Sequence, residues 1–267
     1  MKKFRVAQEE KVKLDKSDPD STSYFDGSKK DALRKIDKLK LRLEALQEKL
    51  YASHKHKVLI VLQGMDTAGK DSTIRLVFQG VNPQGVRVAN FKVPSQEELD
   101  HDFLWRVHKQ VPSSGEIVIF NRSHYEGVLV VRVHNLVPEE VWQHRYQEIN
   151  DFERMLSEEG TCIMKFYLNI SEDEQKRRLE DRLKDPTKEW KFSINDLPER
   201  GHWPEYMNAY EEVFQKTSAG WAPWYIVPAN HKWLRDLIIS SVIVNTLEKL
   251  DLSYPKLDRK TRALSIK

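Results

Sequence analysis

The chain has 267 residues, of which 39% are hydrophobic and 32% charged, so it can build an apolar core and is not a disordered protein. The net charge of +3 is too small to indicate nucleic-acid binding, and the single cysteine, Cys162, excludes an intramolecular disulfide. No apolar run approaches the roughly 20 residues of a membrane helix, and the N-terminus lacks a secretory h-region. We therefore expect a cytoplasmic protein with no membrane or nucleic-acid partner.

The N-terminal part of the chain has the pattern of an extension. Residues 1–28 are polar and rich in turn-forming residues, which predicts an irregular surface arm. Residues 29–51 follow as a predicted helix with one apolar stripe. The stripe either packs on its own domain or forms a contact between subunits, and the second reading favours a homo-oligomer, a dimer or a tetramer. Its members are Ile36, Leu39, Leu43, Leu46 and Leu50.

The remaining chain alternates between two patterns. Short apolar runs predict strands that are buried on both faces, at 58–62, 86–91, 117–120, 162–168 and 224–227. Helical patterns lie near 71–79, 96–109, 138–158, 171–184, 203–217 and 231–249. This alternation predicts an α/β fold, a parallel sheet between two helical layers. The interval from 170 to 223 is too long for a simple crossover and predicts a lid or an extra subdomain.

A phosphate-binding loop is predicted after the first strand. Residues 64–72 read GMDTAGKDS, which satisfies G-x-x-x-x-G-K between a buried strand and a helix. The glycines let backbone N–H groups point at a phosphate, the helix adds its positive end, and Lys70 supplies a cation. A glycine turn with an incidental lysine is the alternative. The other residues expected at the phosphate are Gly64, Met65, Thr67, Ala68, Gly69, Asp71 and Ser72.

Two carboxylates make this loop unusual. The position directly after the lysine commonly holds a Mg²⁺-binding Ser or Thr, but here it is Asp71. Asp66 lies inside the loop, where a phosphate would repel it unless a cation bridges the two. Asp66 is therefore a candidate Mg²⁺ ligand, with the capping of a loop turn as the alternative. For Asp71 we expect capping of the following helix.

A second polar segment follows the third predicted strand. Parallel sheets bind ligands at the carboxyl ends of their strands, so this segment should lie beside the phosphate loop. Asn121 stands where many phosphate-loop enzymes have a metal-binding carboxylate, and Glu126 is a candidate for the missing charge. Arg122 suits bidentate phosphate binding, or a surface salt bridge. His124 and Tyr125 are expected to pack or hydrogen-bond around the site.

The long interval contains a basic segment. Residues 175–191 carry seven positive and four negative side chains. On a helix, Arg178 and Arg182 share a face, and Arg177 is adjacent. A solvated charged helix is the alternative, but the position favours a lid whose arginines close over phosphates.

These motifs together resemble the polyphosphate kinase 2 family over about residues 25–250. They are the loop at 64–70, FKVP at 91–94, NRSHY at 121–125, KEWKFS at 188–193, SAGWAPW at 218–224 and VPA at 227–229. The resemblance implies a thymidylate-kinase-like phosphate-loop fold, a three-layer α/β/α architecture with a five-stranded parallel sheet. It also implies Mg²⁺-dependent, reversible phosphoryl transfer between inorganic polyphosphate and nucleotides, with Mn²⁺ as an alternative metal. The expected division is an arm and helix (1–56), a kinase domain (57–250) with a lid at 175–202, and a tail (251–267).

The resemblance also implies roles for residues. Asp66 and Lys70 match the family's loop carboxylate and loop lysine, and Arg122 matches the arginine of the motif at 121–125. Many members have aspartate at position 121, so the departure argues against Asn121 as a metal ligand. The predicted catalytic residues are Asp66, Lys70, Asn121, Arg122, Glu126, Arg178 and Arg182, with Arg177 as a phosphate contact, Asp66 and Glu126 at the metal, and Asn90, Phe91, Lys92 and Pro94 at the acceptor nucleotide.

The sequence NRSHYE resembles the class III subgroup, whose members phosphorylate both nucleoside monophosphates and diphosphates. We therefore predict a phosphotransferase that moves the terminal phosphoryl group of polyphosphate to AMP and ADP, with guanine nucleotides as further candidate acceptors. The alternatives are an ATP-dependent nucleoside monophosphate kinase of the same fold and a nucleotide-binding switch protein.

Overall fold

A computed structural model describes residues 2–194, 196–262 and 264 of the chain. Its centre is a five-stranded sheet in which all strands are parallel, in the order β2-β3-β1-β4-β5. The strands are β1 (Lys57–Gln63), β2 (Val86–Asn90), β3 (Ile117–Asn121), β4 (Thr161–Asn169) and β5 (Trp224–Pro228). The predicted parallel α/β sheet is confirmed, and each predicted strand end lies within one residue of the observed end.

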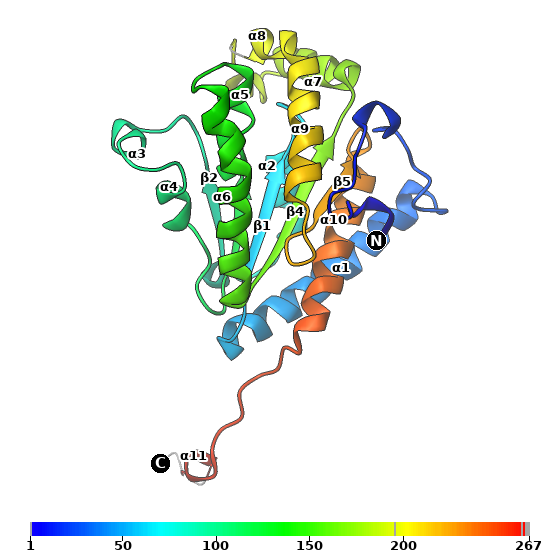
Figure 1. Cartoon of the computed structure of the whole chain (residues 1–267). Helices are drawn as coiled ribbons and strands as arrows, with labels where there is room; N and C mark the ends of the chain where they lie inside the picture. The colour runs from blue at the N-terminus through cyan, green and yellow to red at the C-terminus, as the bar shows by residue number, and fades with distance from the viewer. Residues whose placement is uncertain (1, 195, 263, 265–267) are drawn as a thin grey trace.

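Helices cover both faces of the sheet (Figure 1). One face carries α1 (Lys29–Ser53), α2 (Lys70–Val77) and α10 (Lys232–Leu247). The other carries α6 (Glu139–Glu158), α9 (Trp203–Thr217) and the short α5 (Val130–Val133). Short 3-10 turns connect or follow these elements: η3 (Pro83–Gly85), η4 (His124–Gly127) and η6 (Glu248–Leu250).

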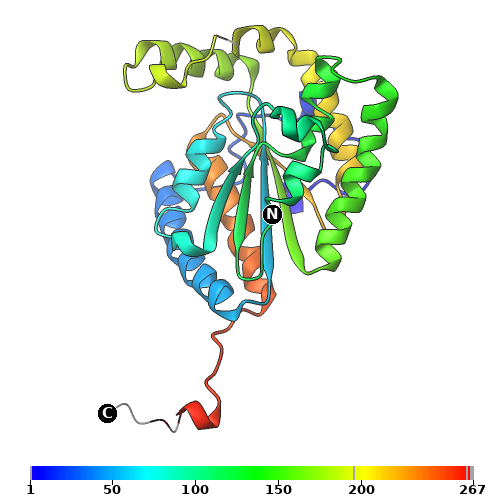
Figure 2. The ribbon, with the colours of Figure 1, turned by 90° about the vertical axis from the view of Figure 1, so that its left-hand side faces the viewer.

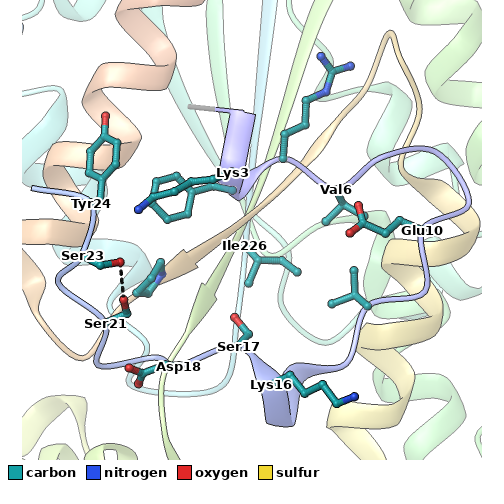
Figure 3. Close-up of a pocket in the computed structure, with 14 residues that line it drawn as sticks. Lys3, Val6, Glu10, Lys16, Ser17, Asp18, Ser21, Ser23, Tyr24 and Ile226 are labelled. Atoms are coloured by element: carbon teal, nitrogen blue, oxygen red, sulfur yellow. Dashed lines mark hydrogen bonds between the residues drawn. The ribbon is translucent and has the colours of Figure 1, made fainter.

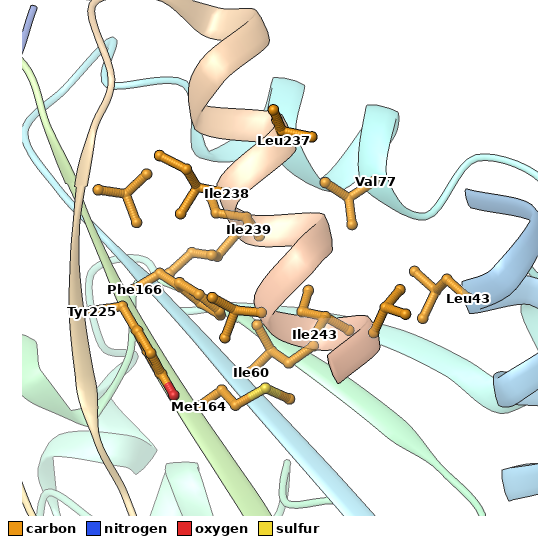
Figure 4. Close-up of a cluster of buried hydrophobic side chains, with 14 of the residues drawn as sticks. Leu43, Ile60, Val77, Met164, Phe166, Tyr225, Leu237, Ile238, Ile239 and Ile243 are labelled. Atoms are coloured by element: carbon orange, nitrogen blue, oxygen red, sulfur yellow. The ribbon is translucent and has the colours of Figure 1, made fainter. Parts of the chain in front are cut away.

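Strand β1 supplies side chains to two separate cores. Val58, Ile60 and Leu62 belong to the core on the α1–α10 side, and the intervening residues Leu59 and Val61 to the core on the α6–α9 side. Figure 4 shows the first core, in which α10 lies against the sheet. Because successive strand residues point to opposite faces, a sheet covered twice requires an uninterrupted apolar run.

Helix α1 packs within its own chain. Ser28 caps it by accepting a hydrogen bond from Asp31 N, with the Asp31 carboxylate accepting from Ser28 N in return. Ile36, Leu43 and Leu50 are buried in the core shared with α10. The prediction that the apolar stripe packs on its own domain is therefore confirmed. The stripe offers no support for the predicted homo-oligomer.

The N-terminal arm covers one edge of the sheet. Apart from η1 (Lys2–Phe4) and η2 (Leu14–Lys16) it is irregular, as predicted. Val6 N donates to Trp224 O at 3.0 Å, so the arm shields backbone groups of the edge strand β5. A cavity of about 380 Å³ lies between the arm and β5. Its lining includes Lys3, Asp18 and Ile226 (Figure 3).

The predicted helix at 96–109 is wrong as a single element. The segment forms two four-residue helices, α3 (Gln96–Leu99) and α4 (Trp105–His108). Between them, the Asp102 side chain accepts a hydrogen bond from Leu104 N at 2.9 Å. Such a local side-chain bond competes with the helical backbone pattern and favours a turn.

The lid elements lie above the carboxyl end of the sheet (Figures 1 and 2). They are α7 (Glu172–Lys184), η5 (Glu189–Lys191) and α8 (Asp196–Gly201). At the opposite end of the molecule the tail extends away from the body and includes α11 (Arg259–Arg262). Within the described residues, no helix combines the length and apolar character that a membrane span requires.

Candidate phosphate-transfer site

The phosphate loop connects β1 to α2, and two of its positions require glycine. Gly64 has φ 151° and Gly69 has φ 105°, both in the region that side chains disfavour. At Gly69, a Cβ atom would lie 1.9 Å from Arg235 Nη1. Gly69 is the N-cap of α2, so the loop passes directly into the helix N-terminus, where backbone N–H groups lack intrahelical partners.

Lys70 lies along this loop with only 9% of its surface exposed. Its ammonium donates to Gly64 O at 2.8 Å and to Met65 O at 3.3 Å. Burial, followed by the charge of Arg122, lowers the pKa of Lys70, while Asp66 and Glu126 oppose this change. A phosphate oxygen entering the loop would compete with these two carbonyls for the ammonium.

Asp66 and Arg122 form an ion pair across the site. Arg122 Nη2 lies 2.6 Å from Asp66 Oδ1, and both side chains are partly exposed. Burial alone would lower the Arg122 pKa, but Glu126 and Asp66 outweigh it and raise the pKa above its usual value. Arg122 also has φ 61°, a strained backbone position at the end of β3. The phosphate loop and the polar segment after β3, residues 121–126, therefore meet as predicted.

Glu126 is the second carboxylate near this pair. Gln63, fully buried at the end of β1, donates to Glu126 Oε1 at 3.1 Å and to Ser123 Oγ at 3.0 Å. Burial raises the pKa of Glu126, although Arg122, Gln63 and Lys70 act in the opposite direction.

The donor set fits a metal that is shared with substrate. Among the described residues, no cluster of three or more His, Cys, Asp and Glu side chains could hold a metal ion. Asp66 and Glu126 supply two carboxylates close to the same arginine. In phosphoryl-transfer sites Mg²⁺ is commonly held by one or two carboxylates together with substrate phosphates, and this pair suits such an arrangement.

Asn121 joins the ends of β2 and β3 to α2. Its Nδ2 donates to Asp71 Oδ1 at 2.6 Å and to Asn90 Oδ1 at 2.9 Å. The capping role expected for Asp71 is wrong. Gly69 is the N-cap of α2, no side chain caps this helix, and the Asp71 carboxylate accepts from Asn121 instead. Ser72 lies one residue further, and its hydroxyl donates to Gly69 O.

The other residues predicted at the acceptor nucleotide follow β2. Phe91 is buried and packs edge-on against Phe120, with ring centroids 4.8 Å apart. Lys92 and Pro94 are exposed. Arg106 donates to Lys92 O at 2.9 Å, so α4 supports this segment next to Asn121.

The three lid arginines differ in their surroundings. Arg177 is exposed and pairs with Glu174 and Asp181. Arg182 is partly buried, donates to Lys191 O at 2.9 Å and lies 3.4 Å from Asp196 Oδ2. Arg178 is 6% exposed and donates to Thr67 O at 3.0 Å and Ala68 O at 3.1 Å, both in the phosphate loop.

A buried polar network holds the segment after β3, residues 121–126, through His124 and Tyr125. His124 Nε2 and Tyr125 OH lie 3.1 and 2.9 Å from Glu153 Oε1, and Lys165 Nζ donates to Tyr125 OH at 2.8 Å. All four side chains are at most 2% exposed. The structural role predicted for His124 and Tyr125 is therefore confirmed.

Sequence reasoning missed several polar residues of this region. Arg235 and Asp236 form a buried pair on α10, 2.8 Å apart, and Arg235 donates to Ala68 O at 3.2 Å. Gln175 Nε2 donates to Asp66 O at 3.1 Å. The available signal was the charged pair itself, because Arg235 and Asp236 are the only charged residues in the sequence from Leu234 to Val244.

The parallel sheet, the glycine loop with Lys70 and the helical lid over the strand ends define a phosphate-loop kinase. A profile of the polyphosphate kinase 2 (PPK2) family matches residues 26–255, and the chain belongs to this family.

Relatives resemble the chain over nearly its whole length. An AMP/ADP-polyphosphate phosphotransferase of Meiothermus ruber is 57% identical, with 96% of each chain covered. An ADP-polyphosphate phosphotransferase of Rhodopseudomonas palustris is 46% identical, with 96% of this chain and 92% of that protein covered. A crystal structure of polyphosphate kinase 2 from Arthrobacter aurescens superposes with a TM-score of 0.93 at 44% identity, covering 97% and 94% of the two chains.

Proposed function

We propose that the chain transfers the terminal phosphoryl group of inorganic polyphosphate to AMP and to ADP, giving ADP and ATP, in a reversible reaction. The observation that carries this proposal is the Meiothermus ruber relative, which is named for both acceptors and matches 96% of each chain at 57% identity. The site agrees with it, because Lys70 and Arg122 bring two cations to the carboxyl end of the sheet beside the glycine loop. Adenine nucleotides are the proposed acceptors, with guanine nucleotides as further candidates.

In the proposed reaction the phosphate loop and Lys70 hold the end of the polyphosphate. Arg122 and the lid residue Arg182 stabilise negative charge on the phosphoryl group in transfer. The acceptor nucleotide lies near Asn90, Lys92 and the neighbouring residues. Its attacking group is already a phosphate oxyanion, so positioning and electrostatics, rather than a catalytic base, supply the rate enhancement.

Asp66 and Glu126 are the proposed ligands of Mg²⁺, with Mn²⁺ as a substitute. A bound divalent cation would neutralise charge between the phosphate chains of donor and acceptor. Without a cation, the partly exposed Asp66 carboxylate would repel an incoming phosphate, and its present partner is Arg122. Removal of divalent metal by EDTA should therefore abolish transfer.

Offering AMP and ADP separately with long-chain polyphosphate and Mg²⁺ tests the acceptor range. Products are resolved by chromatography, and the Lys70→Met variant serves as a control for contaminating kinases. We expect ADP and then ATP from AMP, and ATP from ADP. ATP formed from ADP alone would keep the family activity and remove the dual-acceptor proposal.

A further inference from the structure

Arg178 is bonded through every N–H group that its side chain carries. A guanidinium has five N–H donors. Nε donates to Glu174, Nη1 to the carbonyls of Thr67 and Ala68, and Nη2 to the carbonyls of Ala229 and Asn230, at 2.6–3.1 Å. With 6% of its surface exposed, this side chain has no donor left for a phosphate.

A second buried arginine reaches the same loop carbonyl from α10. Arg235 Nη1 donates to Ala68 O at 3.2 Å, Nη2 donates to Ser72 Oγ at 3.1 Å, and Nε donates to Asp236 Oδ1 at 2.8 Å. Arg235 is 1% exposed. The Ala68 carbonyl therefore accepts from two guanidinium groups that belong to two different helices.

The consequence for the loop follows from the planarity of the peptide bond. The carbonyl of Ala68 and the N–H of Gly69 belong to one rigid unit and point in opposite directions. Two guanidinium donors that hold the carbonyl on one side therefore direct the Gly69 N–H to the other. Arg178 also holds the Thr67 carbonyl, but the Ala68 N–H of that peptide unit donates to Met65 O at 3.1 Å within the loop, so the argument concerns the Gly69 N–H.

We propose that Arg178 and Arg235 are positioning residues that hold the Ala68 carbonyl of the phosphate loop and thereby orient the Gly69 N–H toward the bound phosphate. Arg182 differs, because its charge is more exposed and its contact with Asp196 is longer, at 3.4 Å. Phosphate contact in the lid then belongs to Arg182, and Arg178 acts only through the loop. The kinetic part of this inference rests on the proposed polyphosphate activity.

Replacement of arginine by lysine distinguishes a positioning residue from a residue that contacts phosphate. A residue that contacts phosphate by charge keeps part of its function as lysine. In a positioning residue, the compact ammonium of lysine cannot replace the five hydrogen bonds of a planar guanidinium. The test therefore compares Arg178→Lys with Arg178→Gln. Arg235→Lys is a second variant, and Lys184→Gln is the control, because Lys184 is exposed on the same helix.

Two readouts are measured on each variant below its thermal midpoint: kcat and KM for polyphosphate, and amide hydrogen exchange of residues 66–70 without substrate. We expect Arg178→Lys and Arg178→Gln to lose kcat/KM equally, by roughly 100-fold, with KM raised, because a displaced loop binds the donor less well. Loop exchange should accelerate in both and in Arg235→Lys. Lys184→Gln should stay within about threefold of the wild type.

Three outcomes would overturn the proposal. Activity of Arg178→Lys close to wild type would mean that Arg178 contacts phosphate by charge. Loop exchange at the wild-type rate would mean that neither arginine positions the loop. A fall in kcat with unchanged KM and unchanged exchange would mean that Arg178 acts on the transfer step without positioning the loop. The exchange measurement needs no substrate, so it stays informative even if polyphosphate is not the donor.

Discussion

Replacing Asn121 with aspartate would turn its attractive contact with Asp71 into a repulsive one. Asn121 now donates one hydrogen bond to Asp71 at 2.6 Å and one to Asn90 at 2.9 Å. The variant loses both and sets a second carboxylate against Asp71. Two unit charges about 4 Å apart repel by ~1 kcal/mol in water and by ~4 kcal/mol at an effective dielectric constant of 20. Asp71 is exposed, so the lower figure applies to the charge.

The lost hydrogen bonds add about 0.5–1.5 kcal/mol each, which brings the expected destabilisation to about 2–4 kcal/mol. For a chain of this size that corresponds to a fall in the thermal midpoint of roughly 4–12 °C. Asn121→Ala is the control, because it removes the hydrogen bonds without adding charge.

Thermal unfolding of the wild type and both variants, in EDTA and in Mg²⁺, separates the effect of the added charge from that of the lost hydrogen bonds. We expect Asn121→Asp to unfold below Asn121→Ala in EDTA, and Mg²⁺ to raise the midpoint of the Asp variant selectively, because a divalent cation can bridge two carboxylates. Equal midpoints for the two variants in EDTA, with no selective response to Mg²⁺, would refute the described contact between position 121 and Asp71.

Four further predictions test other parts of the structure. Lys70→Met should lower kcat by roughly 100-fold or more while the thermal midpoint stays within a few degrees, and activity close to wild type would remove Lys70 from the mechanism. Lys165→Met should cost about 3–5 kcal/mol in urea unfolding at neutral pH, because it leaves the buried Glu153 carboxylate without its cation. Burial tends to raise the pKa of Glu153, but Lys165 and His124 outweigh it and lower the pKa, so its contribution to stability is present above the usual glutamate pKa and is lost as pH falls through the lowered value. Glu153→Gln should accordingly reduce this acid dependence, and an unchanged pH profile would contradict the assignment. Burial raises the pKa of Cys162 to about 11, so its alkylation at pH 8 should be roughly 100-fold slower than that of a free cysteine, and a rate near the free value would contradict it.

The sequence predicted the sheet and the loop because both depend on local patterns. A strand covered on both faces must be apolar throughout, and β1 shows this directly. The glycines and Lys70 have fixed spacing, and the hydrogen bonds of Lys70 go to Gly64 and Met65, six and five positions away in the chain. The turn at Asp102 was missed because one side-chain hydrogen bond decides between a helix and two short turns.

The surroundings of the lid arginines were beyond sequence reasoning. Arg178 and Arg182 have the same chemistry and share a helix face, yet one is bonded to carbonyls of the phosphate loop and the other to the lid. This difference depends on how α7 lies against the loop and against the segment after β5. Arg235 contacts Ala68 across 167 positions of the chain, a separation at which spacing carries no information.

The proposed function requires polyphosphate, rather than ATP, as the phosphoryl donor. It is tested most directly by initial rates of ADP formation from AMP with one protein preparation, offering polyphosphate or ATP as the sole donor in Mg²⁺. We expect rapid transfer from polyphosphate and little from ATP. Rapid transfer from ATP with none from polyphosphate would mean that the same fold and site serve a nucleoside monophosphate kinase, and would contradict the proposed function.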